Sequence, residues 1–253
     1  MTGPIVVDVG NTNIKWGRCA DGRVVDIAAL PPDAPDDWQR QSDLWAVGSS
    51  SKWTVSGVHP ARRDALVIWL RDSRADVKVL DSYRQLPLSI RVDEPDKVGI
   101  DRLLNAVAAN TRRPPNSAAV IVDAGSAVTV DLVDGAGEFR GGAIFPGLRL
   151  MAKALHEHTA LLPLVEFDTI EQAPAGNTIA AIRAGILAAV RGGIWQLVCR
   201  YVESADADNA MPVYVTGGDA SLLLAADPEL GKHWPEMTLH GILHSIGGQV
   251  ADG

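Results

Sequence analysis

Residues Ile5 to Thr12 read Ile-Val-Val-Asp-Val-Gly-Asn-Thr, and residues Val120 to Ala127 repeat the pattern as Val-Ile-Val-Asp-Ala-Gly-Ser-Ala. Each copy is an apolar run that ends in Asp-x-Gly. The two aspartates, Asp8 and Asp123, are separated by 115 residues (123 − 8 = 115). An apolar run that feeds such a turn is typical of a strand. The spacing therefore predicts two hairpins of the same design, one in each half of the chain.

The duplicated register continues beyond the motif. Gly22, in Ala-Asp-Gly, and Gly137, in Gly-Ala-Gly, are again 115 residues apart (137 − 22 = 115). A tight glycine turn after a strand can bring backbone N–H groups close to a phosphate, and an aspartate there can hold a hydrated cation. A single Asp-x-Gly is equally consistent with an ordinary turn. Two copies in register favour two hairpins that grip a nucleotide from both sides.

This arrangement resembles the actin-like ATPase superfamily, which includes acetate and sugar kinases, chaperone ATPases and actin. The resemblance implies an α/β fold of two tandem ribonuclease H-like domains with an interdomain nucleotide cleft. The segment Thr-Arg-Arg-Pro-Pro-Asn-Ser at residues 111–117 breaks the chain just before the second copy. We therefore expect the first domain at residues 1–115 and the second at residues 116–253.

Composition and charge exclude several classes of protein. Hydrophobic residues make up 47 % of the 253 residues and charged residues 21 %, as in ordinary globular proteins. The formal net charge is −8, and the longest basic clusters are Arg62-Arg63 and Arg112-Arg113. A phosphate backbone would have little to hold, so no nucleic-acid partner is expected.

The chain shows no sign of export, disulfide bonding or a zinc site. Its first strand begins at Ile5 without a basic or apolar leader, and no uninterrupted apolar stretch approaches about 18 residues. Cys19 and Cys199 are far apart and form no C-x-x-C. His156 and His158, the one close pair of histidines, would point to different faces of a helix. We expect a cytoplasmic protein with no membrane span.

Hydrophobic periodicity and turn signals predict most of the remaining elements. For the first half they predict a loop at 31–37, a strand within 43–51, a helix from Pro60 to about Arg74, a strand at Val77–Leu80 and a helix ending at Asn110. For the second half they predict a helix from about Leu148 to His156, a long helix opening at 176–178, and a strand at 213–219 before a helix starting near Ala220. The long helix carries an apolar stripe, expected in the core, of Ile179, Ile182, Ile186, Val190 and Ile194.

Taken in order, several segments resemble the type III pantothenate kinases, also known as the Bvg accessory factor family. These segments are Asp8–Lys15, Gly99–Arg102, Asp123–Thr129, Gly141–Gly142 with Pro146–Gly147, Gly176–Thr178 and Thr216–Asp219. The resemblance covers essentially the whole chain, and its most specific element is the Gly-x-Asp-Arg of Gly99–Arg102. It implies an ATP-dependent kinase that converts pantothenate to 4′-phosphopantothenate, the first step of coenzyme A biosynthesis.

The resemblance also implies a role for individual residues. Those expected to bind ATP are Asp8, Val9, Gly10, Asn11, Thr12, Asn13, Ile14, Lys15 and Ser126. Those expected to bind pantothenate are Gly99, Ile100, Asp101, Arg102 and Thr178, with Asp101 as the proton acceptor. Asp8 is expected to hold Mg²⁺ and Asp123 a monovalent cation, K⁺ or NH₄⁺. A homodimer is expected as well.

Elementary chemistry agrees with these roles and leaves some alternatives open. Phosphoryl transfer needs aligned reactants, neutralised charge and an acceptor for one proton. Because an alkyl hydroxyl is too weak an acid to ionise first, Asp101 would take the proton late. Asp101 could also cap a helix starting at Arg102, and the two roles are compatible. Arg102 could be a surface charge or a ligand of a carboxylate or phosphate.

Two further segments carry the same ambiguity between structure and binding. Lys15 could be solvated, or it could share with Asn13 a strand face directed at the nucleotide. Asn177 and Thr178 could simply begin a helix, so the substrate role of Thr178 rests on the resemblance.

Two positions depart from the family pattern. Ser126 stands where the family usually has threonine, which keeps the hydroxyl. Val92, three residues before Pro95, stands where the family often has tyrosine, so either one pocket wall is aliphatic or the alignment slips locally.

Two other functions remain possible from the sequence. The protein could be another small-molecule kinase or a phosphatase of the superfamily. It could also be a non-catalytic nucleotide-binding protein that acts through partners. The presence of Asp8, Asp101 and Asp123 together argues against the second, because a pure binder needs no proton acceptor.

Overall fold

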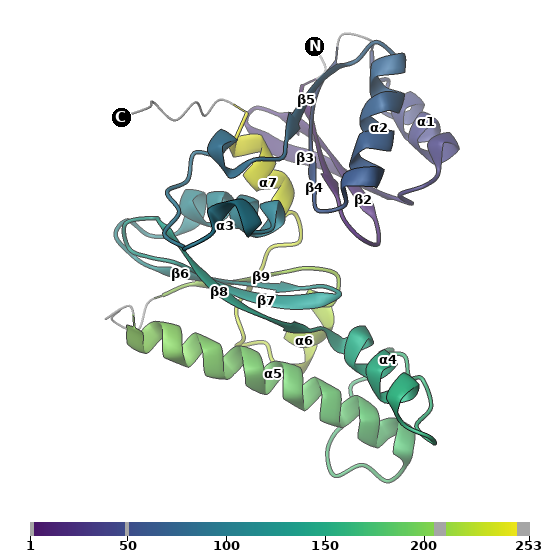
Figure 1. The fold of residues 1–253 in the computed structure, drawn as a ribbon, viewed down its shortest axis with the longest axis vertical. Coiled ribbons are helices and arrows are strands. Elements are labelled where there is room, and N and C mark those ends of the chain that lie inside the picture. The colour runs from purple at the N-terminus through teal and green to yellow at the C-terminus, as the bar shows by residue number, and fades with distance from the viewer. Residues whose placement is uncertain (1–2, 49–50, 205–210, 247–253) are drawn as a thin grey trace. The chain divides into compact units, whose positions relative to one another are not determined.

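The computed structural model describes residues 3–48, 51–204 and 211–246 (Figure 1). Residue contacts divide the chain into two compact units, Met1–Arg112 with Glu236–Gly253, and Arg113–Pro235. Each unit is built on a five-stranded mixed sheet. The expected α/β fold class is therefore confirmed.

The first unit contains these elements in chain order: β1 (Ile5–Val9), β2 (Ile14–Ala20), β3 (Arg23–Leu30), α1 (Pro35–Leu44), β4 (Lys52–Gly57), α2 (Pro60–Asp72), β5 (Asp76–Leu80), the 3₁₀ turns η1 (Tyr83–Gln85) and η2 (Pro95–Lys97), α3 (Ile100–Arg112) and α7 (Met237–His244). Its sheet order is β3-β2-β1-β4-β5. Strands β1, β2 and β3 pair antiparallel, whereas β4 and β5 run parallel to β1.

The second unit repeats this topology. Its elements are β6 (Ala119–Ala124), β7 (Ala127–Val133), β8 (Phe139–Pro146), α4 (Leu148–His158), α5 (Thr178–Ser204), β9 (Val213–Thr216), α6 (Ala220–Ala226) and β10 (Lys232–His233). The sheet order is β8-β7-β6-β9-β10, with β6, β7 and β8 antiparallel and β9 and β10 parallel to β6. The predicted pair of similar hairpins is confirmed.

The two turn glycines lie where the repeat predicts them. Gly22 joins β2 to β3 with a φ of 72°, and Gly137 precedes β8 with a φ of 86°. A positive φ is readily adopted by glycine because it has no Cβ. The hairpins differ in one detail, because four residues separate the paired Val9 and Ile14, and three separate the paired Ala124 and Val128.

In each sheet, alternate apolar side chains pack against the helices that cover it. In the first unit Ile5, Val7 and Val9 are buried in a core shared with α2. In Figure 1, α1 and α2 lie on one side of this sheet and α7 on the other. A tryptophan cluster completes the core, and the rings of Trp16 and Trp53 meet edge to face with centroids 4.8 Å apart.

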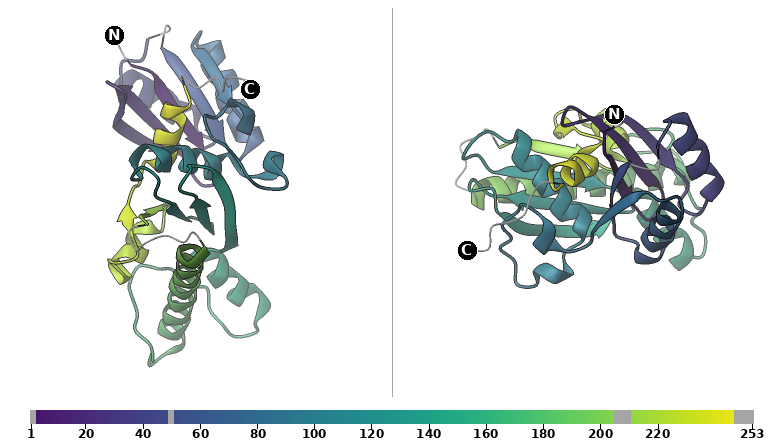
Figure 2. Two further views of the ribbon diagram at one scale, coloured as in Figure 1. Left: turned by 90° about the vertical axis from the view of Figure 1, so that its left-hand side faces the viewer. Right: turned by 90° about the horizontal axis from the view of Figure 1, so that it is seen from above.

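In the second unit, α5 covers one face of the sheet (Figures 1 and 2). Val120 and Val122, at the positions that repeat Ile5 and Val7, share a core with the α5 stripe. The expectation of a core stripe is confirmed for Ile182, Ile186, Val190 and Ile194, whereas Ile179 is 46 % exposed.

Helix α5 is the one described helix that is long and apolar enough, with 27 residues, to cross a membrane. Length and composition alone are weak evidence of a span, because core helices of globular proteins pass the same test. Here α5 packs on β6, β7 and α4 and is interrupted by Arg183 and Arg191, both of which form ion pairs. These contacts identify it as a packed helix of the second unit.

Two predictions about the first unit are wrong. Residues Leu44–Val47 were expected in a strand, but Leu44 ends α1 and Ala46 lies in a turn with a φ of 49°. Residues 31–37 were expected to form a loop, but α1 begins at Pro35, because proline fits the first position of a helix. The strand instead begins at Lys52, because Trp53 and Val55 alternate into the core. Residues 49–50 lie outside the described residues.

The division of the chain also differs from the expected one. The expected second domain, residues 116–253, includes α7, yet α7 packs on α3 and β1 of the first unit. The approach is close, since a Cβ on Gly241 of α7 would lie 2.0 Å from the carbonyl oxygen of Leu104. Contacts so distant in sequence leave no local signal, so the chain pattern alone assigned α7 to the wrong neighbours.

Candidate active site

The first Asp-x-Gly turn lies at the end of β1. Asp8 is half-buried and pairs in register with Lys15 on β2 and with Ser56 on β4. Residues that pair directly across strands project to the same face, so Asp8 and Lys15 share a face of the sheet. This arrangement brings one carboxylate and one ammonium group to the strand end where the turn begins.

The turn itself is made of exposed residues. The N–H of Gly10 donates to the carbonyl of Asn13 at 3.1 Å, which closes the turn. Asn11, Thr12 and Asn13 are exposed. Within the described part of the chain, the N–H groups of Asn11 and Thr12 make no backbone hydrogen bond. N–H groups of a turn that make no backbone hydrogen bond suit an anion such as phosphate.

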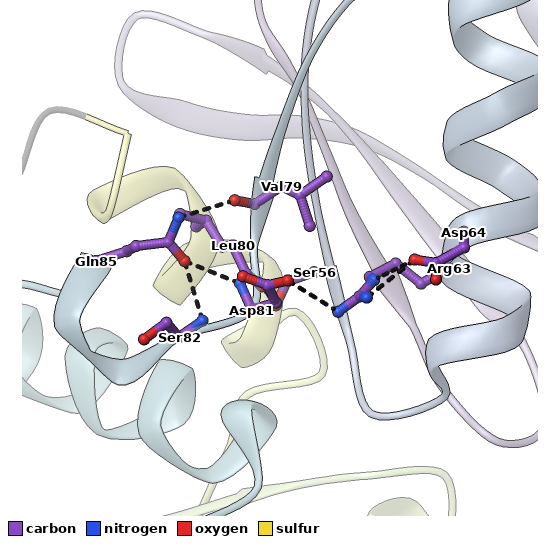
Figure 3. Close-up of polar contacts among 8 residues, drawn as sticks. All are labelled: Ser56, Arg63, Asp64, Val79, Leu80, Asp81, Ser82 and Gln85. Atoms are coloured by element: carbon purple, nitrogen blue, oxygen red, sulfur yellow. Dashed lines mark hydrogen bonds and ion pairs between the residues drawn. The ribbon is translucent and has the colours of Figure 1, made fainter. Parts of the chain in front are cut away.

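A polar frame holds the neighbouring strand ends, β4 and β5 (Figure 3). The buried Ser56 hydroxyl donates to the carbonyl of Leu80 at 2.7 Å. Beyond β5, the Gln85 side-chain oxygen accepts from the N–H groups of Asp81 and Ser82, each at 3.0 Å. Arg63 of α2 reaches Asp81 at 3.5 Å. These bonds join the ends of β4 and β5 to the segment after β5 and to the start of α2.

Arg62, next to Arg63 on α2, contacts the Asp-x-Gly turn after β1, whereas Arg63 contacts Asp81. Its guanidinium donates to the carbonyl of Asn11 at 2.5 Å and to the carboxylate of Asp33 at 3.1 Å. Sequence reasoning missed this residue, because Arg62 and Asn11 are 51 residues apart and nothing local marks the contact.

Asp101 lies in the first turn of α3. Its Oδ1 accepts the N–H of Arg102 at 2.8 Å, and this same N–H also reaches the carbonyl of Gly99 at 3.1 Å. The helix starts at Ile100 rather than at Arg102, so Asp101 sits inside the helix while its carboxylate still accepts a helix N–H. The cap-like bond and a proton-accepting role remain compatible.

The carboxyl group of Asp101 is electrostatically perturbed. Burial raises its pKa above the ordinary aspartate value, and the N–H and guanidinium of Arg102 act in the opposite direction. Gly99 borders it closely, because a Cβ there would lie 2.6 Å from Oδ1 of Asp101. The glycine of Gly-x-Asp-Arg therefore leaves room for the carboxylate of the same motif.

The second turn lies at the end of β6. Asp123 is half-buried and pairs with Thr129 on β7 and Thr216 on β9. Ser126 is exposed at the turn, and its carbonyl accepts the N–H of Gly147 at 2.9 Å. Gly147 precedes α4, and a Cβ on it would lie 2.2 Å from the carbonyl oxygen of Gly125. The start of α4 is therefore pressed against the turn.

The Gly217-Gly218 turn follows β9 and borders a pocket of the second unit. Gly217 has a φ of 97°, and the N–H of Asp219 donates to the carbonyl of Ala124 at 2.9 Å. The buried Asp219 carboxylate accepts a hydrogen bond from Arg149 of α4. Both residues line a pocket of about 630 Å³. Sequence reasoning did not single out Arg149, because its partner lies 70 residues away.

Thr178 is the first residue of α5. The side chain of Asn177 accepts the N–H of Ala180 at 2.9 Å, so Asn177 caps the helix. Thr178 lines a larger, mainly apolar hollow of about 940 Å³, formed by α4, α5 and the segments beside them. Leu161, in the segment after α4, is 91 % exposed, and Trp195 on α5 is 58 % exposed.

The carboxylate beside the first turn, that of Asp8, is of the type that ligates magnesium. Among the described residues no group of three or more His, Cys, Asp or Glu side chains is assembled for a metal ion. Mg²⁺ typically keeps several waters and binds through one or two carboxylates together with substrate phosphates. Asp8 lies beside the Asp-x-Gly turn of the first unit and provides one such carboxylate.

The predicted site residues are divided between the two units. In the first unit Asp8, the turn after it and Lys15 adjoin one another, and Gly99–Arg102 begin α3, which packs on β4 beside β1. In the second unit Asp123 and Ser126 share a hairpin, and Thr178 begins α5.

Matched mixed sheets, each with an aspartate at the end of its central strand, form the actin-like ATPase fold. Solved structures show the same fold. A Campylobacter jejuni protein described as a Baf family transcriptional activator has a TM-score of 0.59 at 21 % identity, over 96 % of each chain. The ADPNP-bound activator of the 2-hydroxyisocaproyl-CoA dehydratase from Clostridium difficile has a TM-score of 0.53 at 14 % identity, over 97 % of this chain and 92 % of that one.

Sequence comparison identifies the family. The profile described as type III pantothenate kinase matches residues 4–200. The type III pantothenate kinase of Rubrobacter xylanophilus is 39 % identical over 94 % of this chain and 95 % of its own. That of Synechococcus sp. strain JA-3-3Ab is 36 % identical over 92 % and 88 %. The chain belongs to the type III pantothenate kinases, and its activity is the phosphorylation of pantothenate for coenzyme A biosynthesis.

Proposed function

We propose that Asp101 accepts the proton of the primary hydroxyl of pantothenate while that oxygen attacks the γ-phosphorus of ATP. The new bond joins the hydroxyl oxygen to phosphorus, and the bond that breaks joins phosphorus to the oxygen bridging to the β-phosphate. ADP leaves with that electron pair, and the proton passes to Asp101. The single observation behind this proposal is the half-buried carboxylate at the start of α3, with its raised pKa.

We further propose that the nucleotide phosphates bind at the two Asp-x-Gly turns. In the first turn the binding groups are Asp8 to Lys15, where the N–H groups of Asn11 and Thr12, which make no backbone hydrogen bond in the described part of the chain, would donate to phosphate oxygens. In the second turn the exposed Ser126 would contribute its hydroxyl. These donors would neutralise charge that develops on the phosphate oxygens during transfer.

Two cations belong to this proposal. Asp8 would hold Mg²⁺, and Asp123 a monovalent cation, K⁺ or NH₄⁺. The cations would supply positive charge next to the phosphates, which is their usual role in phosphoryl transfer.

Pantothenate would lie against Gly99, Ile100, Arg102 and Thr178. The planar guanidinium of Arg102 suits the carboxylate of pantothenate, because two parallel N–H groups can bind both carboxylate oxygens. Thr178 would add a hydroxyl from the start of α5.

We also propose that the enzyme is a cytoplasmic homodimer. The apolar hollow along α4 and α5 is the kind of surface that monomers rarely leave open to water. Sedimentation or light scattering of the purified protein tests this directly, and a monomer at all concentrations would contradict it.

The assignment of Asp101 is tested by ATP-dependent phosphorylation of pantothenate, with K⁺ present or replaced by Na⁺. We expect K⁺-dependent turnover in the wild type and loss of turnover in Asp101→Asn, with ATP binding retained. Asp96→Asn is the matched control, since Asp96 lies five residues earlier, is 67 % exposed and pairs only at the surface with Arg84. Substantial turnover by Asp101→Asn would refute the acceptor role.

A further inference from the structure

We propose that Arg62 is a positioning residue for ATP: it orients the peptide group between Asn11 and Thr12 in the first turn. This inference rests on the proposed function, because it takes the turn to be a phosphate-binding element. It adds a residue that no sequence motif marks.

The contacts of Arg62 join three segments of the first unit. It stands in the first turn of α2, whose start is fixed by Pro60 and by His59, the ring of which accepts the N–H of Arg62 at 3.4 Å. From there the guanidinium reaches the Asn11 carbonyl at 2.5 Å and Asp33, in the segment before α1, at 3.1 Å. The side chain is 27 % exposed, whereas Asp33 is 69 % exposed. The ion pair at that exposure contributes little stability by itself, so its main effect is to aim the guanidinium.

The bond to Asn11 has a geometric consequence. A trans peptide group is planar, and its C=O and N–H point in opposite directions. By holding the carbonyl of Asn11, Arg62 therefore turns the N–H of Thr12 to the opposite side of the turn. That N–H makes no backbone hydrogen bond in the described part of the chain. A flexible turn would have to lose conformational freedom when phosphate binds, whereas a held peptide has already lost it.

The internal repeat supplies an independent comparison. By the 115-residue offset, Asn11 corresponds to Ser126 in the second turn (11 + 115 = 126). The carbonyl of Ser126 is also held from outside its turn, by the N–H of Gly147 at 2.9 Å. The second turn is one residue shorter, so this match holds when residues are counted from the aspartate. In both units a carbonyl of the turn is held by a donor from outside the turn.

The neighbouring Arg63 provides the matched control. Both arginines belong to the first turn of α2, and Arg63 is the less exposed of the two, at 15 %. Arg63 contacts Asp64 at 2.9 Å and Asp81 at 3.5 Å (Figure 3), away from the turn. Arg62→Gln and Arg63→Gln each remove one guanidinium from the start of α2. Only Arg62→Gln also removes the bond to Asn11.

The experiment compares wild type, Arg62→Gln, Arg62→Lys and Arg63→Gln in steady-state kinetics, with ATP affinity measured separately by calorimetry. We expect Arg62→Gln to raise the KM and Kd for ATP about three- to tenfold, with the KM for pantothenate within twofold of wild type. Arg62→Lys should recover part of the ATP affinity, because one ammonium can still donate to the Asn11 carbonyl. Arg63→Gln should leave ATP affinity unchanged.

Two outcomes would overturn the proposal. One is an ATP affinity of Arg62→Gln within twofold of wild type. The other is an equal loss in Arg63→Gln, which would show a general effect on α2. Thermal midpoints for all variants identify a variant that does not fold, in which case Arg62→Lys carries the comparison. If the wild type binds ATP but leaves pantothenate untouched, the proposed mechanism fails while the calorimetric comparison of Arg62 still stands.

Discussion

Gly57 and Gly217 occupy equivalent places in the two sheets. Each lies at the end of the parallel strand beside the central Asp-x-Gly strand, and each backbone presses on it. A Cβ on Gly57 would lie 2.3 Å from the carbonyl oxygen of Val9, and one on Gly217 would lie 2.4 Å from that of Ala124. Val9 and Ala124 are themselves related by the repeat (9 + 115 = 124). The duplication thus extends to close backbone packing behind both turns.

Replacing either glycine should therefore disturb the strand that carries an aspartate. We expect Gly57→Ala and Gly217→Ala each to lower the free energy of unfolding by about 1–3 kcal/mol, because the clash is with backbone that cannot move aside cheaply. Gly218→Ala is the control, since nothing lies within 4 Å of its Cβ. Urea titration measures the difference, and equal stability of Gly217→Ala and Gly218→Ala would contradict the packing argument.

Gly99→Ala should impair turnover more than stability. Its Cβ would meet Oδ1 of Asp101, the end of a side chain, so the carboxylate can move and the backbone can stay. We expect kcat to fall about tenfold or more, as misplaced reacting groups commonly cause, with the thermal midpoint close to wild type. Gly48→Ala, with open space around its Cβ, is the matched control. An unaltered kcat in Gly99→Ala would show that the position of this carboxylate does not limit catalysis.

The raised pKa of Asp101 predicts a pH-dependent cost in stability. Between the unfolded and the higher folded pKa, the native state binds more protons than the unfolded state, so the free energy of unfolding falls as pH rises. Above the folded pKa the buried charge destabilises the fold. We expect Asp101→Asn to be more stable than wild type at pH 7, with the difference shrinking as pH falls through the folded pKa. Thermal unfolding from pH 4 to 8 measures this, and a pH-independent difference would be inconsistent with it.

The same shift should appear in the kinetics. Because the acceptor must be deprotonated, kcat/KM should rise with pH along an acid limb whose midpoint lies above the ordinary aspartate value of 3.8. A pH profile recorded with constant ionic strength locates this midpoint. An acid limb with its midpoint at or below pH 3.8 would show that Asp101 is not the proton acceptor.

The two cysteines should differ in reactivity. Burial raises the pKa of the Cys19 thiol to about 11, so little thiolate is present at pH 8, and its side chain is 1 % exposed. Cys199 on α5 is partly exposed. We expect a thiol reagent at pH 8 to label Cys199 at least tenfold faster than Cys19 in the folded protein, and both alike in urea. Comparable rates in the folded state would show that Cys19 becomes exposed through opening of β2.

The elements that carry the candidate site could be predicted because their signals are local. The two turns, the start of α3 at Gly99–Arg102 and the start of α5 at Thr178 each follow from a short motif. The errors also have a local origin. Residues 44–47 are Leu, Trp, Ala and Val and so look like a strand, yet α1 ends at Leu44, because Trp38 of α1 and Trp45 just after it pack into the tryptophan core.

The sequence by itself determined the duplicated α/β fold and the family, and it predicted roles for Asp8, Asp101 and Asp123. These follow from periodicity and from motifs whose residues are neighbours in the chain. Only the tertiary structure decided that α7 packs on α3, that Arg62 holds the Asn11 carbonyl and that Asp219 is paired with Arg149. The physical reason is that each of these contacts joins residues at least 50 positions apart, and their energy depends on burial and geometry that exist only after the chain has folded.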